Sequence, residues 1–282
     1  LRTRQAARTI AGRVCAWKPP NVLPLSRASY LSGQSAGESI PTVFQTLKNG
    51  GVVFRRGQTT VLAAAPGVGK SLTALRIALE ARVPTLYISA DTDAWDTKVR
   101  TATHLTGHRY ATVEKAYDTS NGHLYDEAFA NLDWLRFKFA PSPSLTEIDV
   151  EVEAFGMVYG EYPHIIIVDN LRNVYPDDEA GASDYTGALR IVEYMHDLGR
   201  ESNAHVFLLA HLVGKYEDGD APVPLSGLEN KIGKLPEKVL TMYHDSPTRI
   251  GVCVVKNRGG KGAADASIRV YLNFDPEYVR IG

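Results

Sequence analysis

The stretch AAPGVGKS, from Ala64 to Ser71, has the residue types that bind the phosphates of a nucleotide. Gly67 and Gly69 allow the backbone to turn so that successive N–H groups point at phosphate oxygens. Lys70 supplies a positive charge for the outer phosphates, and the Ser71 hydroxyl is a suitable ligand for Mg²⁺. The segment therefore predicts a phosphate-binding loop in which Ala64 replaces the usual first glycine. The predicted nucleotide contacts in this loop are Ala65, Pro66, Gly67, Val68, Gly69, Lys70, Ser71 and Leu72.

A second candidate for the magnesium site is the carboxylate that ends the apolar run HIIIVDN, at Asp169. If this run is a buried parallel strand, Asp169 lies at the carboxyl edge of the sheet, where ligands bind in open α/β folds. An apolar run that ends in Asp is weak evidence by itself. Together with a phosphate-binding loop it predicts that Asp169 and Ser71 share the work of holding Mg²⁺.

The elements that must position these residues alternate between strand and helix along residues 59–212. The expected strands are 59–65, 85–90, 136–140, 164–170 and 205–212, and the expected helices are 71–81, 94–105, 145–159 and 185–202. Three further apolar runs, KVLTMYH, RIGVCVVKN and ASIRVYLNF, follow without an intervening helix. This order predicts an α/β fold with a mainly parallel central sheet, flanking helices and an antiparallel C-terminal extension.

Charge is distributed unevenly over the 282 residues. The net charge is −1, yet residues 1–35 contain six cations and no acid, so the remainder carries −7. A basic arm on a mildly acidic body is compatible with nucleic-acid contact but does not demonstrate it. The two cysteines, Cys15 and Cys253, lack the spacing of a zinc site, which favours a reducing compartment. No run of 18 apolar residues occurs, so we expect no membrane contact and a cytoplasmic location.

We expect two parts in the chain. Residues 1–40 form a basic N-terminal helix, over 2–16, and an arm rich in Pro and Ser; residues 41–282 form the nucleotide-binding domain. Three interpretations of the N-terminal part stay open. It is a solvated basic tail, a helix that docks on a neighbouring subunit, or an organellar transit peptide, which is Arg-rich and poor in acids.

Several motifs, taken in order, resemble one known family. They are FRRGQTTVLAAAPGVGKS, TLYISADTD, HIIIVDN, HVFLLAHL, PLSGLENKIG and VVKNRGGKG. In this order they are similar to the motifs of the RecA-like motor domain of DnaB-type hexameric replicative helicases, including phage-encoded ones. The resemblance covers residues 40–282 and implies a RecA-like P-loop ATPase fold. The terminal Lys-x-Arg pattern is more specific than the phosphate loop, which many ATPases share.

The resemblance also implies roles for four residues outside the loop. Asp91 falls where the family has its catalytic glutamate, and His211 falls at the γ-phosphate sensor, which is often Gln. Lys256 and Arg258 match the pair that reaches the nucleotide of the neighbouring subunit in the ring. Such a cation delivered in trans stabilises the charge that develops on the transferred phosphate. The alternative for VVKNRGGKG is a surface hairpin with two solvated cations.

The role of Asp91 has competitors. Asp is one methylene shorter than Glu, so it must lie closer to the attacking water. Asp93, or Glu80 on the first helix, could serve instead, although neither stands at the matching position. Asp91 could also simply cap the helix that begins near Ala94.

The implied function is an ATP- and Mg²⁺-dependent helicase motor for DNA replication. It would form a hexameric ring that translocates on single-stranded DNA in a bacterial or phage-infected cell, with a primase or a loader as further partners. Cations in two loops are the candidate DNA contacts, although solvated loops explain them equally well: Arg172, Lys215, Lys231 and Lys234. Two other classes stay open: a RecA-like recombination or loading ATPase that binds DNA without unwinding it, and a regulatory ring ATPase that does not act on DNA.

Overall fold

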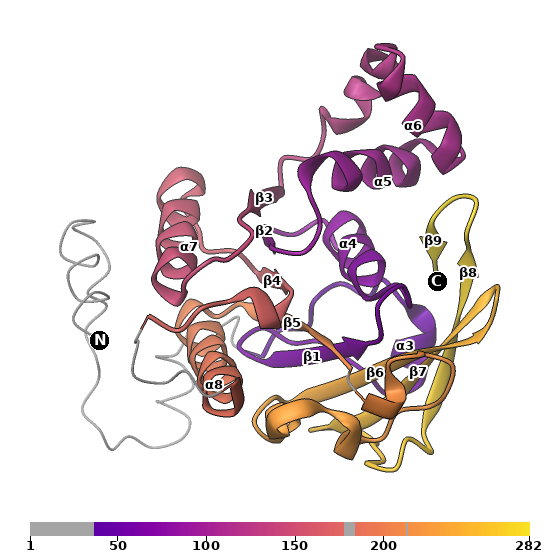
Figure 1. The fold of residues 1–282 in the computed structure, drawn as a ribbon. Helices are drawn as coiled ribbons and strands as arrows, with labels where there is room; N and C mark the ends of the chain where they lie inside the picture. Colours follow the sequence, from indigo (N-terminus) through magenta and orange to yellow (C-terminus); the bar gives the residue numbers. More distant parts are fainter. Residues whose placement is uncertain (1–36, 178–183, 213) are drawn as a thin grey trace.

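The computed structural model describes residues 37–177, 184–212 and 214–282 (Figure 1). The predicted N-terminal helix over 2–16, most of the arm and Cys15 lie outside these residues. Within the described residues, no helix is both long and apolar enough to span a membrane.

One sheet of nine strands forms the centre of the domain, in the order β3-β2-β4-β5-β1-β6-β7-β8-β9. The strands are β1 (Thr59–Ala64), β2 (Thr85–Ser89), β3 (Leu135–Phe139), β4 (Ile165–Asp169), β5 (His205–His211), β6 (Lys238–Ser246), β7 (Arg249–Asn257), β8 (Arg269–Asp275) and β9 (Arg280–Ile281). Pairing is parallel from β3 through β6 and antiparallel from β6 to β9. This confirms the predicted parallel sheet with an antiparallel C-terminal extension.

Helices cover both faces of the sheet. The helices α7 (Leu145–Tyr159) and α8 (Asp184–Ser202) bury apolar side chains against one face, together with Val61, Ile166 and Leu208. The helices α3 (Gln45–Asn49) and α4 (Lys70–Glu80) pack on the other face, around Leu62, Ile167 and Leu209. Alternate residues of each central strand thus enter opposite cores, which explains why these strands are apolar throughout.

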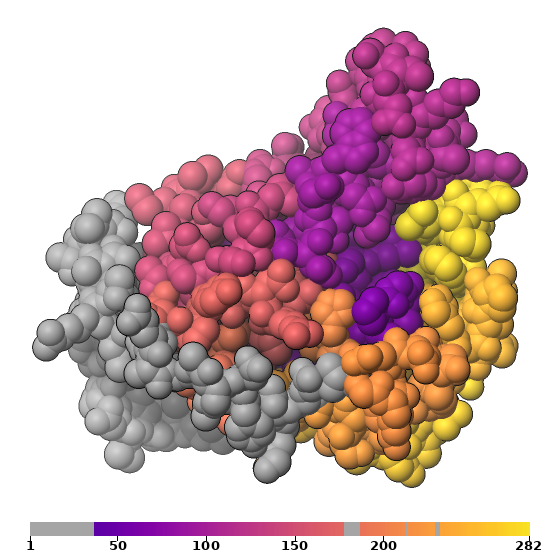
Figure 2. Space-filling view, in the orientation of Figure 1, coloured from indigo at the N-terminus to yellow at the C-terminus, as the bar shows by residue number. Residues whose placement is uncertain are grey.

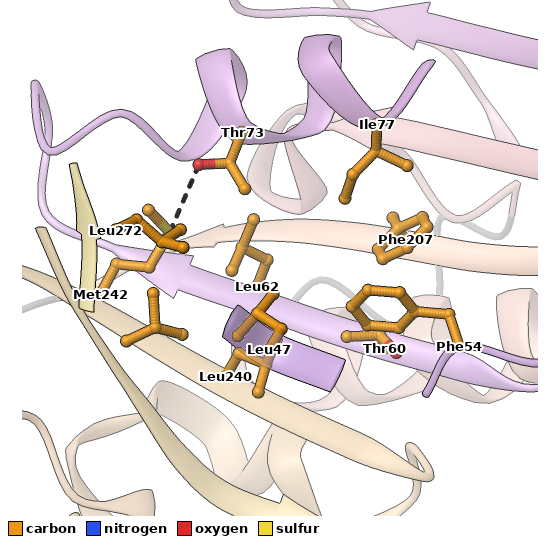
Figure 3. A pocket seen from close by; sticks show the side chains of 11 residues that line it. Leu47, Phe54, Thr60, Leu62, Thr73, Ile77, Phe207, Leu240, Met242 and Leu272 are labelled. Carbon is orange, nitrogen blue, oxygen red and sulfur yellow. Dashed lines mark hydrogen bonds between the residues drawn. The ribbon is translucent and has the colours of Figure 1, made fainter. Parts of the chain in front are cut away.

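The α4 side of the sheet contains a small apolar cavity of about 10 Å³ (Figure 3). Side chains from α3, α4 and strands β1, β5, β6 and β8 converge on it, and Thr73 Oγ1 donates a hydrogen bond to Met242 Sδ at 3.9 Å. Helix α4 is therefore packed against β6 as well as β1. This packing fixes the helix whose first residue is Lys70.

A helical insertion between α5 (Ala94–Thr106) and β3 was not expected from the sequence. It comprises α6 (Tyr110–Asp118) and the 3₁₀ helix η1 (Gly122–Phe129), and it projects beyond the rest of the molecule (Figures 1 and 2). A small core of its own holds it together, with Val99, Val113 and Tyr125 buried. At its base the Tyr110 amide donates to the Glu277 carbonyl in the β8–β9 turn.

Strand direction divides the functional motifs between two edges of the sheet. We call the carboxyl ends of the parallel strands the phosphate-loop edge, because the loop follows β1 there, and we call the other the opposite edge. Strand β7 is antiparallel to β6, so it begins at the phosphate-loop edge and ends at the opposite edge. Asn257, its last residue, pairs with Lys238, which pairs in turn with Thr60 at the start of β1. Arg258 therefore lies roughly 13 Å or more from the end of β1, at about 3.3 Å per residue.

Candidate nucleotide site

The loop between β1 and α4 has the geometry that phosphate binding requires. Gly67 and Gly69 adopt φ values of +81° and +100°, which are strained for any residue with a side chain. Val68, between them, is buried and anchors the loop. Helix α4 begins at Lys70, with Gly69 as its N-cap, so its free N–H groups and positive dipole end face the loop. Pro66 and Gly67 are exposed at the tip, while Ser71 and Leu72 are partly exposed on the first turn.

Lys70 lies at the centre of a polar cluster that three separate strands assemble. Its Nζ atom lies 3.8 Å from Asp91 Oδ2, 4.0 Å from Asp169 Oδ1 and 3.5 Å from His211 Nε2. Asp91 follows β2, Asp169 ends β4 and His211 ends β5. The structure therefore brings four sequence-predicted residues together at the phosphate-loop edge. Only 6% of the Lys70 side chain is exposed, so its charge is directed into this cluster.

Asp169 is fully buried, and its two carboxylate oxygens differ. Oδ2 accepts a hydrogen bond from the Tyr87 hydroxyl at 2.9 Å, whereas Oδ1 has no hydrogen-bond partner among the residues that the structure describes. Burial, and then the neighbouring Asp169, raise the pKa of Tyr87 well above its usual value, so Tyr87 remains a donor. A buried carboxylate oxygen without a donor is costly unless something else binds it. Asp169 Oδ1, beside the loop that carries Ser71, thus fits the oxygen ligands of Mg²⁺.

The structure separates Asp91 from its two competitors. Asp93 caps α5: its Oδ1 accepts from the Asp96 amide at 2.8 Å. Glu80, at the last turn of α4, pairs with Arg76 at 2.9 Å and His104 at 3.3 Å, away from the loop. Asp91 is instead 40% exposed beside Lys70, and its amide donates to the Asp169 carbonyl at 3.2 Å. Asp91 is therefore the candidate base that lies in the cluster.

His211 is oriented by Asn170, which the sequence did not single out. Asn170 Oδ1 accepts from the Arg172 amide, so its Nδ2 faces His211 Nε2 at 2.9 Å. An amide nitrogen only donates, which makes Nε2 an acceptor and places the ring proton on Nδ1. Burial, followed by Lys70, lowers the pKa of His211, so the ring is neutral at pH 7. Donation from Nε2 to a phosphate would thus require a proton shift or a second proton.

Lys256 and Arg258 lie at the opposite edge, and they differ. Lys256 Nζ donates to the Gly233 carbonyl at 3.0 Å and to the Lys234 carbonyl, so it is engaged within its own chain. Burial, and then the Arg258 charge, lower the pKa of Lys256. Arg258 is 56% exposed, and its Nη1 lies 3.5 Å from Glu237 Oε1. Neither cation reaches the phosphate loop of its own chain.

The candidate DNA contacts do not form one group. Arg172, in the 3₁₀ helix η2 (Leu171–Asn173), and Lys215, in η4 (Gly214–Tyr216), are exposed after β4 and β5 at the phosphate-loop edge. Lys231 and Lys234 lie in η6 (Glu229–Lys234), next to Lys256 at the opposite edge. Lys215 Nζ also lies 5.0 Å from the Tyr216 ring centroid, within the range of a cation–π contact.

Three residues that contact the candidate site residues were not singled out in the sequence: Tyr87, Asn170 and Glu237. Asn170 directly follows Asp169, so its place at the strand end was a usable signal. Tyr87 stands two residues before the end of an apolar run, where an aromatic residue normally indicates only core packing. Glu237 contacts Arg258 only because β6 and β7 pair, and no window of sequence shows that pairing.

A glycine loop between a strand and a helix, with a buried lysine facing two carboxylates, defines a P-loop ATPase of the AAA/RecA-like class. The chain belongs to the AAA domain family, which matches residues 37–216. Two curated relatives carry only the name Gene 65 protein. The one from Mycobacterium phage L5 is 39% identical over 258 residues, covering 89% of this chain and 95% of the relative. The one from Mycobacterium phage D29 is 36% identical over 228 residues, covering 78% of this chain and 97% of the relative.

Solved structures confirm the RecA-like fold. One of them, described as an ATPase domain, aligns with a TM-score of 0.73 and 16% identity, over 91% of this chain and 95% of that one. A DnaB-like replicative helicase, described with its interactions with primase, aligns with a TM-score of 0.74 and 17% identity. That alignment covers 91% of this chain but 64% of the helicase chain. The resemblance to the motor domain of DnaB-type helicases is thus confirmed at the level of fold.

Proposed function

We propose that this protein is a ring-forming DNA helicase motor that couples ATP hydrolysis to movement along single-stranded DNA during replication. The observation that carries the proposal is the separation of the phosphate loop from Arg258. An exposed arginine at the opposite edge of the sheet cannot reach a nucleotide bound to the phosphate loop of its own chain. It suits a nucleotide held by the next subunit of a ring. The fold shared with DnaB-like helicase ATPase domains supports the same interpretation.

Each residue of the polar cluster has a role in this proposal. The backbone N–H groups of residues 65–72, except Pro66, which has none, and the Lys70 side chain hold the phosphates, and Ser71 and Asp169 hold Mg²⁺. Bound Mg²⁺ would neutralise charge on the phosphate oxygens. Asp91 accepts a proton from the attacking water, and His211 responds to the γ-phosphate. Arg258 of the adjacent subunit, with Lys256 as its proposed companion, stabilises the transferred group.

ATP turnover is expected to rise when single-stranded DNA is added, and the particle mass in the same buffer should be that of a ring. Unwinding of a forked duplex is measured in parallel. Blunt duplex DNA serves as the control ligand, because it offers no single strand to grip. A DNA-stimulated ring that fails to separate strands would favour a recombination or loading ATPase. A ring whose turnover ignores DNA would favour a regulatory ATPase.

Asp91→Asn is expected to bind ATP normally and to lose about 10²–10⁴-fold in turnover, the usual contribution of a general base. The amide keeps the size of the side chain but no longer accepts a proton. Turnover and nucleotide affinity are measured on the same preparation. Asp93→Asn is the matched control, because Asn caps helices as well as Asp does. Equal turnover in Asp91→Asn and Asp93→Asn would show that Asp91 is not the base.

A further inference from the structure

The carboxylate of Glu237, directly before β6, is fixed at the opposite edge of the sheet. Its Oε2 accepts a hydrogen bond from the Thr59 amide at 2.9 Å, and its Oε1 lies 3.1 Å from His196 Nε2 on α8. Backbone hydrogen bonds hold the same residue: the Glu237 amide donates to the Thr59 carbonyl at 3.0 Å. Only 11% of the Glu237 side chain is exposed. The carboxylate therefore has little freedom to move.

Glu237 is also charged at neutral pH. Burial works to raise the pKa of Glu237, but hydrogen bonds from the Thr59 amide and from His196 outweigh it, and the pKa lies below the ordinary value. A fixed, ionised and largely buried carboxylate needs a cation. Two nitrogen atoms lie beside Oε1, His196 Nε2 at 3.1 Å and Arg258 Nη1 at 3.5 Å, and Arg258 is the permanently charged one of the two.

Arg258 has a fixed backbone but an exposed side chain. It follows the last residue of β7, and Gly259, with φ of +90°, turns the chain away immediately after it. The Arg258 amide donates to the Glu237 carbonyl at 2.8 Å, which fixes the backbone but not the side chain. An exposed arginine side chain has many rotamers, and ordering it costs conformational entropy.

We infer that Glu237 is a positioning residue for Arg258, holding the guanidinium by one Nη and leaving its other N–H groups free for the phosphate of the adjacent subunit. This inference rests on the proposed function. Glu237 acts through Arg258 and does not touch the nucleotide. A guanidinium that is already ordered loses less conformational entropy when it binds the nucleotide of the adjacent subunit. The Glu237–Arg258 pair therefore favours contact between Arg258 and that nucleotide.

Glu237→Gln tests the inference, because it keeps the shape of the side chain and an oxygen for the Thr59 amide but removes the charge. We expect turnover in the ring to fall about tenfold, with the KM for ATP and the particle mass unchanged. Glu237→Asp keeps the charge and should retain more turnover than Glu237→Gln. Glu161→Gln is the control: Glu161 is an exposed carboxylate at the same edge, paired with His164. Thermal unfolding verifies that each variant is folded.

Two further measurements separate positioning from a general structural effect. In the Arg258→Ala background, Glu237→Gln should cause no additional loss of turnover, because Glu237 acts only through Arg258. Subunits with Glu237→Gln, mixed and exchanged with Lys70→Ala subunits, should recover turnover. The Lys70→Ala subunits supply a correctly held Arg258 to the intact pockets of their Glu237→Gln neighbours.

The outcomes distinguish this inference from the proposed function. If Arg258→Ala is slow but Glu237→Gln turns over like wild type, the positioning role is wrong and the trans cation stands. The same holds if Glu237→Gln slows Arg258→Ala by the same factor as it slows wild type. If Arg258→Ala itself turns over normally, the proposed trans cation and the role of Glu237 both fail. Should Glu237→Gln not assemble, Glu237→Asp, whose shorter side chain withdraws the carboxylate from Arg258, should lower turnover in the wild-type background but not in the Arg258→Ala background.

Discussion

Arg258→Ala subunits are expected to bind ATP almost normally and to hydrolyse it about 10³–10⁵-fold more slowly, the range measured for a trans arginine in phosphoryl transfer. Binding should persist because the pocket of the same chain keeps Lys70, Ser71 and Asp169. Hydrolysis should fail because the missing cation acts on the pocket of the adjacent subunit. Single-turnover hydrolysis and nucleotide affinity are measured together. Arg200→Ala removes an exposed arginine from the end of α8, at the same edge, and should behave as wild type.

Mixing gives the decisive form of this experiment. A Lys70→Ala subunit has a dead pocket but an intact Arg258, which is the reverse of the defect in Arg258→Ala. Once the two variants exchange subunits, some interfaces place an intact phosphate loop from one subunit beside an intact Arg258 from the next. The ATPase activity of the mixture should then exceed that of either variant alone. Mass measurement confirms the exchange. If exchange occurs and the activity equals the sum of the two parents, Arg258 does not serve a neighbour.

Lys70→Ala should abolish hydrolysis and weaken ATP binding while leaving the fold intact. Lys70 is the only cation among the described residues in contact with both Asp91 and Asp169. Without it, two carboxylates face the incoming phosphates uncompensated, and Coulomb repulsion opposes binding. Nucleotide titration, turnover and circular dichroism are measured on one sample. Lys98→Ala, at a partly exposed position of α5, is the control for loss of a lysine.

Near-normal turnover by a folded Lys70→Ala variant would exclude this loop as the active site. Loss of folding would be informative in another way. It would mean that Lys70 is needed to neutralise the buried Asp169 before any nucleotide binds. Repeating the unfolding experiment with Lys70→Met separates the two cases, because Met fills the space of the lysine stem without its charge.

Local patterns predicted the centre of the fold well because local physics decides it. The run TTVLAAA has the length and the β-branched residues of a buried strand, and the glycines after it favour a turn. The predicted helix 145–159 matches α7, since Ser144 and Glu147 form a capping box at its start. The insertion was missed because α6 buries only Val113 and therefore lacks an apolar stripe. Its stability comes from contacts with α5 and η1, which no window of sequence reveals.

The candidate site was also only partly predictable from the sequence. The phosphate loop and Asp169 follow from residue type and position at the ends of strands. The choice among Asp91, Asp93 and Glu80 could not be made from spacing, because it depends on which side chain caps α5 and which meets Arg76. The intrachain contacts of Lys256 involve carbonyls more than twenty residues earlier, in a 3₁₀ helix without a sequence signature.

The two-edged layout of the sheet has a consequence for energy economy in the cell. If the arginine that completes each pocket always belongs to another chain, a newly made, unassembled subunit consumes almost no ATP. ATP hydrolysis would begin only when subunits assemble. An open ring would have one inactive nucleotide site, at the gap between its two end subunits. Dilution below the concentration needed for assembly would then stop ATP hydrolysis without an inhibitor. Subunits that lack the arginine would also inactivate the sites of the normal subunits beside them.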